Sequence, residues 1–363
     1  MDKNNYAVIM AGGVGERFWP MSKTKRPKQF IDILGTGKTL IAQTYERFLD
    51  VCIPENIYVV TNKIYKDLVL SQLEGIKEEQ IICEPARKNT APCIAYAAYK
   101  LHALNPSARM VVAPSDHIIL KEAIFSSIIR SALDAAREGD NFYTLGIKPG
   151  RPDTGYGYIQ YVADEIFEGQ PLMRKVKTFT EKPNEELATS FLQSGDFLWN
   201  SGIFIWSSKA IIDAFEKFQP EISDVFQKAI GLYNTPQEVT YMDNAYVSCK
   251  SISIDYAIME KAENVFVFIS DFGWSDLGTW GSLYESRNKD EHNNAIIGSN
   301  VMTYETTNCI VNVPNDKIVV LQGLDNYIIS ESDNALLICQ KQQEQQIRKF
   351  VNDIRLFRGE EFA

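Results

Sequence analysis

Through the first two thirds of the 363-residue chain, short apolar runs alternate with longer stretches whose apolar residues recur at helical spacing. The short runs predict buried strands, at residues 6–11, 56–60, 80–83 and 109–114. The longer stretches predict helices between them, at residues 40–50 and 90–104. Strand–helix–strand alternation of this kind predicts an α/β fold around a parallel sheet that helices cover on both faces.

Ligands of such sheets lie beyond the carboxyl ends of the strands. We therefore expect functional residues to cluster directly after the predicted strands, in the segments Ala11–Gly15, Glu84–Thr90 and Pro114–His117.

The pattern changes after about residue 285. Brief Ile/Val runs, as in CIVNVPNDKIVVLQ (309–322), are separated by Asn, Asp, Gly and Ser, which are turn residues. This pattern predicts a small β-rich domain, and the irregular repeat of the short strands is also compatible with a short β-helix. The stretch QEQQIRKFVNDIRL (343–356) then predicts a final helix. We thus expect two domains, at residues 1–285 and 286–363.

Composition is that of an ordinary globular protein, with 45% hydrophobic and 23% charged residues. No apolar stretch approaches the roughly 20 residues that span a bilayer, and no signal-peptide pattern follows the N-terminal MDKNNY, so we expect a cytoplasmic protein without a membrane partner. The formal net charge of −10 argues against a nucleic-acid partner. Polyanions can still bind such a protein where its cations converge or a metal ion intervenes.

Cysteine and histidine usage argues against some metal sites and against one kind of catalytic triad. The six cysteines form no CxxC pair, which argues against a zinc site. The three histidines make a histidine-based metal site or a Ser-His-Asp triad a poor interpretation.

The most informative stretch is VIMAGGVGERFWPMSKTKRPKQF (8–30), which departs from two common phosphate-binding motifs. Phe18 stands where the third glycine of a dinucleotide-binding motif belongs. The GTGKT at residues 35–39 is not a P-loop either, because Asp32 replaces its first glycine.

What remains is a glycine-rich turn after a strand, followed by Arg17 and Lys28. Glycines let backbone N–H groups approach an anion, and the two cations would stabilise charge in phosphoryl or nucleotidyl transfer. The alternative is a structural loop with surface cations.

Read as a whole, AGGVGERFWPMSKTKRPKQF (11–30) resembles the signature of sugar-nucleotide pyrophosphorylases, the nucleotidyltransferases that act on sugar 1-phosphates. The variant with Trp19 before Pro20, and with Ser22 after it, is similar to that of the guanylyltransferases for mannose 1-phosphate. Further blocks agree in family order up to about residue 285: EPARKNTAPCIAYAA (84–98), VVAPSDHII (111–119), GIKPGRPDTGYGYIQ (146–160), FTEKPN (179–184), FLWNSGIFIW (197–206), SISIDYAIMEK (251–261) and WSDLGTW (274–280).

This resemblance implies a Rossmann-like nucleotidyltransferase domain with a mixed, mostly parallel sheet. It implies transfer of GMP from GTP to α-D-mannose 1-phosphate, giving GDP-mannose and pyrophosphate, by Mg2+-assisted in-line attack on the α-phosphorus. The implied partners are these two substrates, and the implied assembly is a homodimer.

The resemblance also implies site residues. Arg17 and Lys28 would be catalytic, and Asp116 and Asp276 would bind the metal ion. From the residues alone, each of the two aspartates is also compatible with a helix N-cap. Asp116 is compatible with an Asx turn as well. His117 reads as a positioning or packing residue, because an ionised sugar phosphate needs no base.

Two further groups of residues match substrate-contacting positions of the family. The nucleotide-binding positions are Ala11, Gly12, Gly13, Asn89, Thr90 and Ser115. The sugar-phosphate positions are Gly155, Glu181, Lys182, Asn200 and Asp255. Lys182 reads equally well as a solvated neighbour of Pro183, and Asp255 as a helix N-cap. The preference for guanine rests on the family variant of the motif.

Three alternatives stay open at this point. One is an enzyme for another sugar 1-phosphate or nucleotide, and another is a non-catalytic GDP-sugar-binding regulator. The presence of Arg17, Lys28, Asp116 and Asp276 disfavours the regulator, which would be expected to have lost part of this set. The third is that the C-terminal domain is a docking module for assembly.

Overall fold

The computed structural model describes residues 1–137 and 139–363, which form two compact units. The first unit comprises Met1–Gly12, Ile41–Ser115 and Ile119–Trp274. The second comprises Gly13–Leu40, Asp116–Ile118 and Ser275–Ala363. The division into domains at residue 285 stays a prediction, but the glycine-rich segment groups with the C-terminal part of the chain.

A mixed sheet forms the centre of the first unit. Its order, over the described residues, is β3-β2-β1-β4-β9-β6-β10-β8-β7. The strands are β1 (Asn5–Met10), β2 (Ile57–Asn62), β3 (Ile81–Glu84), β4 (Arg109–Pro114), β6 (Phe142–Ile147), β7 (Gly157–Tyr161), β8 (Met173–Glu181), β9 (Phe197–Ser207) and β10 (Val265–Ser270). Only β8 and β9 run against the other strands of this described sheet. The mixed, mostly parallel sheet is therefore confirmed.

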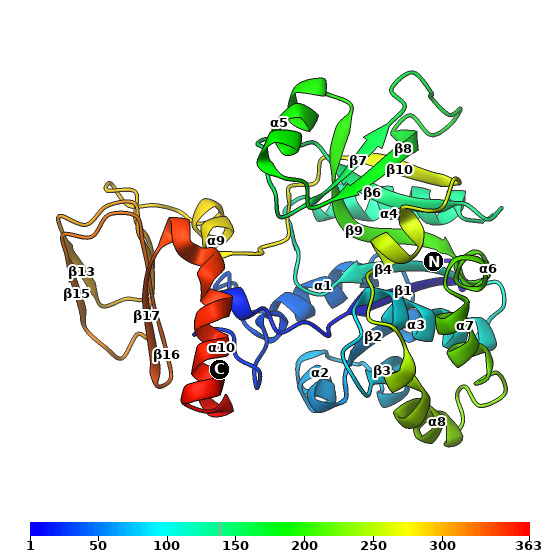
Figure 1. The fold of residues 1–363 in the computed structure, drawn as a ribbon, viewed down its shortest axis with the longest axis horizontal. Helices are drawn as coiled ribbons and strands as arrows, with labels where there is room; N and C mark the ends of the chain where they lie inside the picture. The colour runs from blue at the N-terminus through cyan, green and yellow to red at the C-terminus, as the bar shows by residue number, and fades with distance from the viewer. Residues whose placement is uncertain (138) are drawn as a thin grey trace. The chain divides into compact units, whose positions relative to one another are not determined.

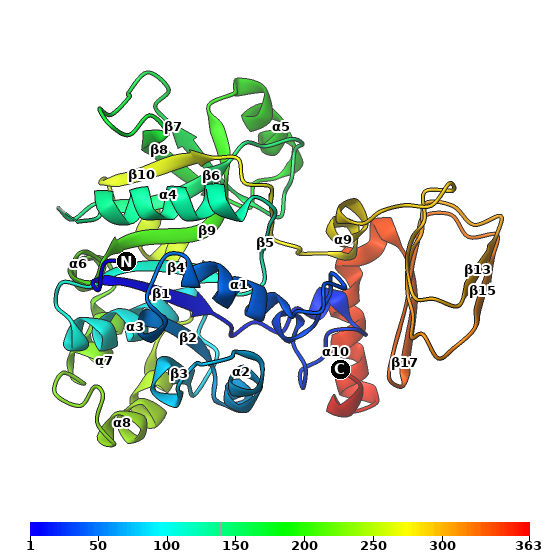
Figure 2. The same ribbon diagram turned by 180° about the vertical axis from the view of Figure 1, so that it is seen from behind.

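Helices cover both faces of this sheet. They are α1 (Leu40–Leu49), α2 (Lys66–Gln72), α3 (Thr90–Leu104), α4 (Glu122–Ala135), α5 (Glu185–Ser194), α6 (Ser208–Phe218), α7 (Pro220–Gln227) and α8 (Gln237–Ala245). Two opposite views show α3, α6 and α7 on one face and α4 on the other (Figure 1, Figure 2). Burial on both faces explains why β1 and β4 are apolar without alternation after their first residues, Asn5 and Arg109. The strands and helices predicted up to residue 114 are confirmed within one or two residues.

The second unit contains a short β-helical coil. Its strands are β12 (Ala295–Ile297), β13 (Val301–Tyr304), β14 (Ile310–Asn312), β15 (Val319–Gln322), β16 (Tyr327–Ser332) and β17 (Ala335–Gln340). The chain alternates between two parallel stacks, β12-β14-β16 and β13-β15, and β17 then returns antiparallel to β16. The β-rich C-terminal region predicted from the sequence is confirmed.

Two helices complete the second unit, α9 (Trp280–Ser286) and α10 (Ile347–Phe357), and α10 lies beside β17 in both views (Figure 1, Figure 2). Ile347 and Val351 of α10 are buried in one apolar cluster with Phe18 and Trp280. The predicted final helix is thus confirmed, and its apolar face packs in the same core as the segment after the glycine turn.

None of the helices within residues 1–137 and 139–363 has the length and apolar character needed to cross a membrane.

Candidate functional site

A cavity of about 380 Å3 lies in the second unit, where the glycine-rich turn, the Asp116 segment and the loop before α9 meet. Four predicted site residues line it together: Arg17, Lys28, Asp116 and Asp276. Its complete lining, among the described residues, is Gly13, Val14, Gly15, Glu16, Arg17, Phe18, Lys28, Asp116, His117, Asp276, Gly278 and Arg348.

The glycine turn forms one wall of this cavity. Within the described part of the chain, the backbone N–H groups of Gly13, Val14 and Gly15 have no hydrogen-bond acceptor. Gly15 has φ of 73°, and a Cβ atom there would lie 2.6 Å from Cβ of Lys28. Glycine is therefore required at residue 15, and the turn offers N–H groups that can bind an anion.

Lys28 begins a short 3₁₀ helix, Lys28–Phe30, and its side chain is 5% exposed. Its Nζ atom lies 2.7 Å from Oδ2 of Asp116. It also donates to the backbone carbonyls of Asp276 and Leu277, at 3.0 and 2.8 Å. An ammonium group has three donors, so these three acceptors fix its position.

The Asp116 carboxyl is held in its ionised form. Burial is the largest single influence and raises its pKa. The charges of Lys28 and then His117 lower the pKa, and the lowering effects together outweigh burial, so the pKa lies below the ordinary value. Residues 118–119 form a short strand, β5 (Ile118–Ile119), so the interpretation of Asp116 as the cap of a helix beginning there is wrong.

Asp276 lies in the loop before α9. Its Oδ1 accepts a hydrogen bond from the Gly278 amide at 3.0 Å, and a Cβ atom on Gly278 would lie 2.5 Å from Oδ2. The N-cap of α9 is Thr279, whose side chain accepts from the Ser282 amide, so Asp276 is not that cap.

Asp116 and Asp276 fit a magnesium ion by chemistry and number. Mg2+ binds proteins through one or two carboxylates and takes its remaining ligands from water and substrate phosphates. The described residues contain no group of three or more His, Cys, Asp or Glu side chains arranged for a metal ion. A two-carboxylate cavity beside an anion-binding turn is consistent with an ion held jointly with a phosphate.

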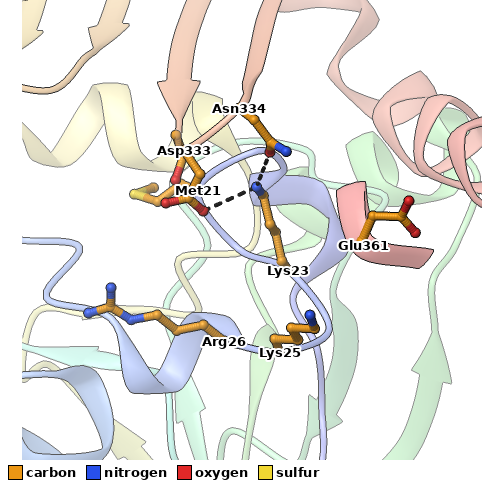
Figure 3. A pocket seen from close by; sticks show the side chains of 8 residues that line it. Met21, Lys23, Lys25, Arg26, Asp333, Asn334 and Glu361 are labelled. Carbon is orange, nitrogen blue, oxygen red and sulfur yellow. Dashed lines mark hydrogen bonds and ion pairs between the residues drawn. The ribbon is translucent and has the colours of Figure 1, made fainter. Parts of the chain in front are cut away.

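The basic cluster at residues 25–28 is divided between two cavities. Lys25 and Arg26 line a separate cavity of about 460 Å3 in the second unit, together with Lys23 (Figure 3). Nζ of Lys23 bonds Asp333 at 3.1 Å and Asn334 at 3.4 Å, while the side chains of Lys25 and Arg26 point in other directions (Figure 3). These cations do not converge on one point, so this cavity is a weaker phosphate site than the one at Lys28.

The predicted sugar-phosphate residues gather in the first unit. Glu181 ends β8, Asn200 lies in β9, and Asp255 begins a π-helical turn, Asp255–Met259. Nδ2 of Asn200 donates to Oδ1 of Asp255 at 2.8 Å, and Lys182 forms an ion pair with Glu181. Gly155 lies just before β7, which begins at Gly157, and its amide already donates to Oδ1 of Asp153 at 2.9 Å.

Glycine is also required on β7, which pairs with both β8 and β9. Gly157 is paired with Glu181, and a Cβ atom on it would overlap Oε2 of Glu181. Burial, and next the charge of Glu181, raise the pKa of Asp255 to about 6. The cluster therefore holds two carboxylates and an amide, which are suitable partners for sugar hydroxyl groups.

The predicted nucleotide-binding residues of the first unit follow the strand ends, whereas Gly13 belongs to the second unit. Oδ1 of Asn89 accepts from the Thr90 amide at 2.8 Å at the start of α3. The Thr90 hydroxyl accepts from the Ile254 amide at 2.8 Å, and the buried Ser115 donates its amide to Met10. These contacts have local structural roles, and base contacts by these residues stay a prediction, as they do for Ala11 and Gly12.

Glu84 is a candidate functional residue that sequence reasoning left without a role. It ends β3, is 5% exposed and accepts a hydrogen bond from the Tyr246 hydroxyl. A Cβ atom on Gly12 would lie 3.2 Å from its Oε2. Burial raises its pKa to about 7, against smaller opposing effects of Tyr246 and Arg87. The signal in the sequence was a carboxylate at the end of a buried strand, inside a segment expected to be functional.

Replacement of Glu84 by glutamine should change how stability depends on pH. A carboxyl whose pKa rises from 4.5 unfolded to about 7 folded contributes stability that is fully present below pH 4.5 and lost as pH rises through 7. The loss is on the order of 3 kcal/mol. Urea unfolding at pH 4.5 and 8 should show this decline in the wild type and a smaller one in Glu84→Gln. Equal declines in both proteins would contradict it, and the exposed Glu79→Gln is the control.

Comparison with known proteins shows the family of the chain. Residues 6–293 match the family model described as nucleotidyl transferase, and residues 299–354 match that of a MannoseP isomerase/GMP-like beta-helix domain. The chain therefore belongs to the nucleotidyl transferase family of enzymes.

Within that family, the relatives that match nearly the whole chain include proteins whose names refer to mannose 1-phosphate. It is 34% identical over 351 residues to a mannose-1-phosphate guanylyltransferase of Klebsiella pneumoniae, covering 96% of this chain and 73% of that protein. It is 35% identical to the alginate biosynthesis protein AlgA of Pseudomonas putida, with coverage of 96% and 71%. A solved structure from Thermus thermophilus, named a mannose-1-phosphate geranyltransferase, has 29% identity and a TM-score of 0.85, covering 97% of this chain and 99% of that one.

Proposed function

We propose that this enzyme transfers GMP from GTP to α-D-mannose 1-phosphate and releases GDP-mannose and pyrophosphate. The observation that carries the proposal is the gathering of Arg17, Lys28, Asp116 and Asp276 around one cavity that the glycine turn lines. The names of the relatives from Klebsiella pneumoniae and Escherichia coli support the choice of substrates.

The reaction requires little covalent chemistry from the protein. An oxygen of the sugar phosphate attacks the α-phosphorus of GTP, and pyrophosphate leaves on the opposite side. The attacking oxygen is ionised at neutral pH, so no base is needed and His117 has no proton to accept. Catalysis then consists of holding two polyanions in line and stabilising the charge that develops.

The residues of the second unit suit this task. The turn amides and Arg17 would bind phosphate oxygens, and Lys28 would present a charge that its three acceptors hold in place. Such fixed donors need no reorganisation during the reaction. Asp116 and Asp276 would hold Mg2+, which neutralises phosphate charge when bound.

The residues of the first unit would select the sugar. Glu181, Asn200 and Asp255 supply acceptors and a donor for hydroxyl groups, and Lys182 and Gly155 complete the proposed sugar-phosphate group. A site that bonds hydroxyls discriminates sharply, because a wrong sugar leaves buried polar groups unpaired. We assign the nucleotide to Ala11, Gly12, Gly13, Asn89, Thr90 and Ser115.

The substitution Glu181→Gln should weaken binding of the sugar phosphate selectively. Loss of one charge-assisted hydrogen bond should raise the KM for mannose 1-phosphate about 10- to 100-fold and leave the KM for GTP nearly unchanged. Initial-rate kinetics with each substrate varied in turn measure this. The exposed Glu186→Gln of α5 is the matched control. An equal rise in both KM values would remove Glu181 from the sugar site.

The proposed function is tested by pyrophosphate release from four nucleoside triphosphates, each combined with mannose, glucose and N-acetylglucosamine 1-phosphates, with Mg2+ or EDTA. We expect release with GTP and mannose 1-phosphate, and loss of release with EDTA. Release with another pair would keep the mechanism and change the substrates. No release from folded protein would favour a GDP-sugar-binding regulator.

We also propose a homodimer, on the basis of the family resemblance of the sequence. Light scattering of the full chain tests this assembly, and the mass of a monomer at micromolar concentration would contradict it.

A further inference from the structure

The C-terminal helix contributes an arginine to the cavity of Lys28. Arg348 lies in the first turn of α10 and lines the cavity with Arg17 and Lys28. All the phosphate-handling residues that the sequence motifs indicate precede residue 285, so Arg348 is an addition from a distant part of the chain.

Packing fixes where α10 begins relative to the glycine turn within the second unit. Ile347 is fully buried and Val351 is 1% exposed, so the residues next to Arg348 anchor the helix in the core. Arg355 of the same helix forms an ion pair with Glu16 at 2.7 Å. The helix is thus held against the segment that follows the turn amides, and Arg348 projects from a fixed backbone.

The partners of the neighbouring charges make Arg348 different from the other cations. Lys28 is neutralised by Asp116, and Glu16 is neutralised by Arg355. Over the residues that the structure describes, the guanidinium group of Arg348 has no hydrogen bond or ion pair. An exposed guanidinium without a partner, in the lining that also contains the unpaired turn amides, leaves a local excess of donors that a polyanion would satisfy.

We propose that Arg348 is a phosphate-binding residue, which contacts the β- or γ-phosphate of the nucleotide and the pyrophosphate product. The planar guanidinium fork matches two phosphate oxygens at once. The turn amides and Arg348 line the same cavity. A diphosphate carries more oxygens and more negative charge than a sugar monophosphate, so it suits both groups of donors better. The assignment of nucleotide and pyrophosphate rests on the proposed function, whereas the affinity for a diphosphate does not.

Titration calorimetry with inorganic pyrophosphate and Mg2+ tests the proposal without turnover. We expect Arg348→Gln to weaken pyrophosphate binding about tenfold, the lower end for a hydrogen bond to a charged group, because the side chain is exposed. Arg348→Lys should weaken it less. Lys349→Gln removes a charge from the adjacent exposed residue, outside the cavity lining, and should bind as the wild type does.

Steady-state kinetics separate phosphate binding from a merely structural role. Arg348→Gln should raise the KM for the nucleotide about tenfold and leave the KM for the sugar phosphate unchanged, with circular dichroism confirming the fold. Wild-type affinity for pyrophosphate in Arg348→Gln, an equal loss in Lys349→Gln, or no binding by the wild type would each overturn the proposal. Weakened pyrophosphate binding in a protein inactive across the substrate panel would refute the proposed function and keep this inference.

Discussion

The substitution Lys28→Gln should lower turnover about a hundred- to a thousandfold. Lys28 delivers a buried charge to the cavity, and three acceptors hold it in one position. Loss of one preorganised positive charge beside a centre of developing negative charge typically has an effect of this size. Glutamine keeps a hydrogen-bond donor for the two carbonyl groups, so the fold should survive better than with an apolar residue.

The pH profile of this variant gives a second readout. Without the charge of Lys28, the raising effect of burial on the pKa of Asp116 is less opposed, so that pKa should increase. Activity requires ionised Asp116, and the acid limb of the rate profile should therefore move to higher pH. The matched control is Lys25→Gln, an exposed lysine that lines the other cavity and should leave turnover unchanged. More than a tenth of wild-type turnover in Lys28→Gln would contradict a catalytic role.

The substitution Asp276→Asn should also cut turnover by two or more orders of magnitude and raise the Mg2+ concentration needed for half-maximal rate. Asparagine has nearly the same shape, and its side-chain oxygen can still accept from the Gly278 amide, so the loop should keep its conformation. What is lost is one of two carboxylate ligands of a small divalent cation.

Two measurements bear on this prediction. Rates across a Mg2+ series report the functional requirement, and Mn2+ binding followed by electron paramagnetic resonance reports affinity without turnover. Asp271→Asn, at an exposed position a few residues earlier, is the control. An unaffected rate together with unchanged Mn2+ affinity would remove Asp276 from the metal site.

The sequence predicted the elements whose signals are local. The strands β1 to β4 and the helices α1 and α3 follow from apolar runs and periodicity, because burial on both faces imposes that pattern. The motif residues Lys28, Asp116 and Asp276 could be grouped only through family resemblance, and the structure brings them to one cavity.

Other features depend on packing between distant segments and left little local signal. Arg348 is one of several polar residues on a predicted helix, and only the docking of that helix decides which one reaches the cavity. The separation of Lys25 from Lys28 depends on the tight turn between Lys23 and Arg26. Glu84 has a raised pKa because the fold buries its carboxyl, even though Tyr246, far along the chain, donates a hydrogen bond that acts against this shift.

The core that joins α10 to Phe18 and Trp280 also bears on biosynthesis. Phe18 is synthesised early, whereas Ile347 lies far along the chain and is added much later. At synthesis rates of about 5–20 residues per second, that interval is on the order of tens of seconds. During this time α10 has not been made, so the apolar side chains that it packs against in the folded protein stay uncovered, and exposed apolar surface of this kind favours aggregation.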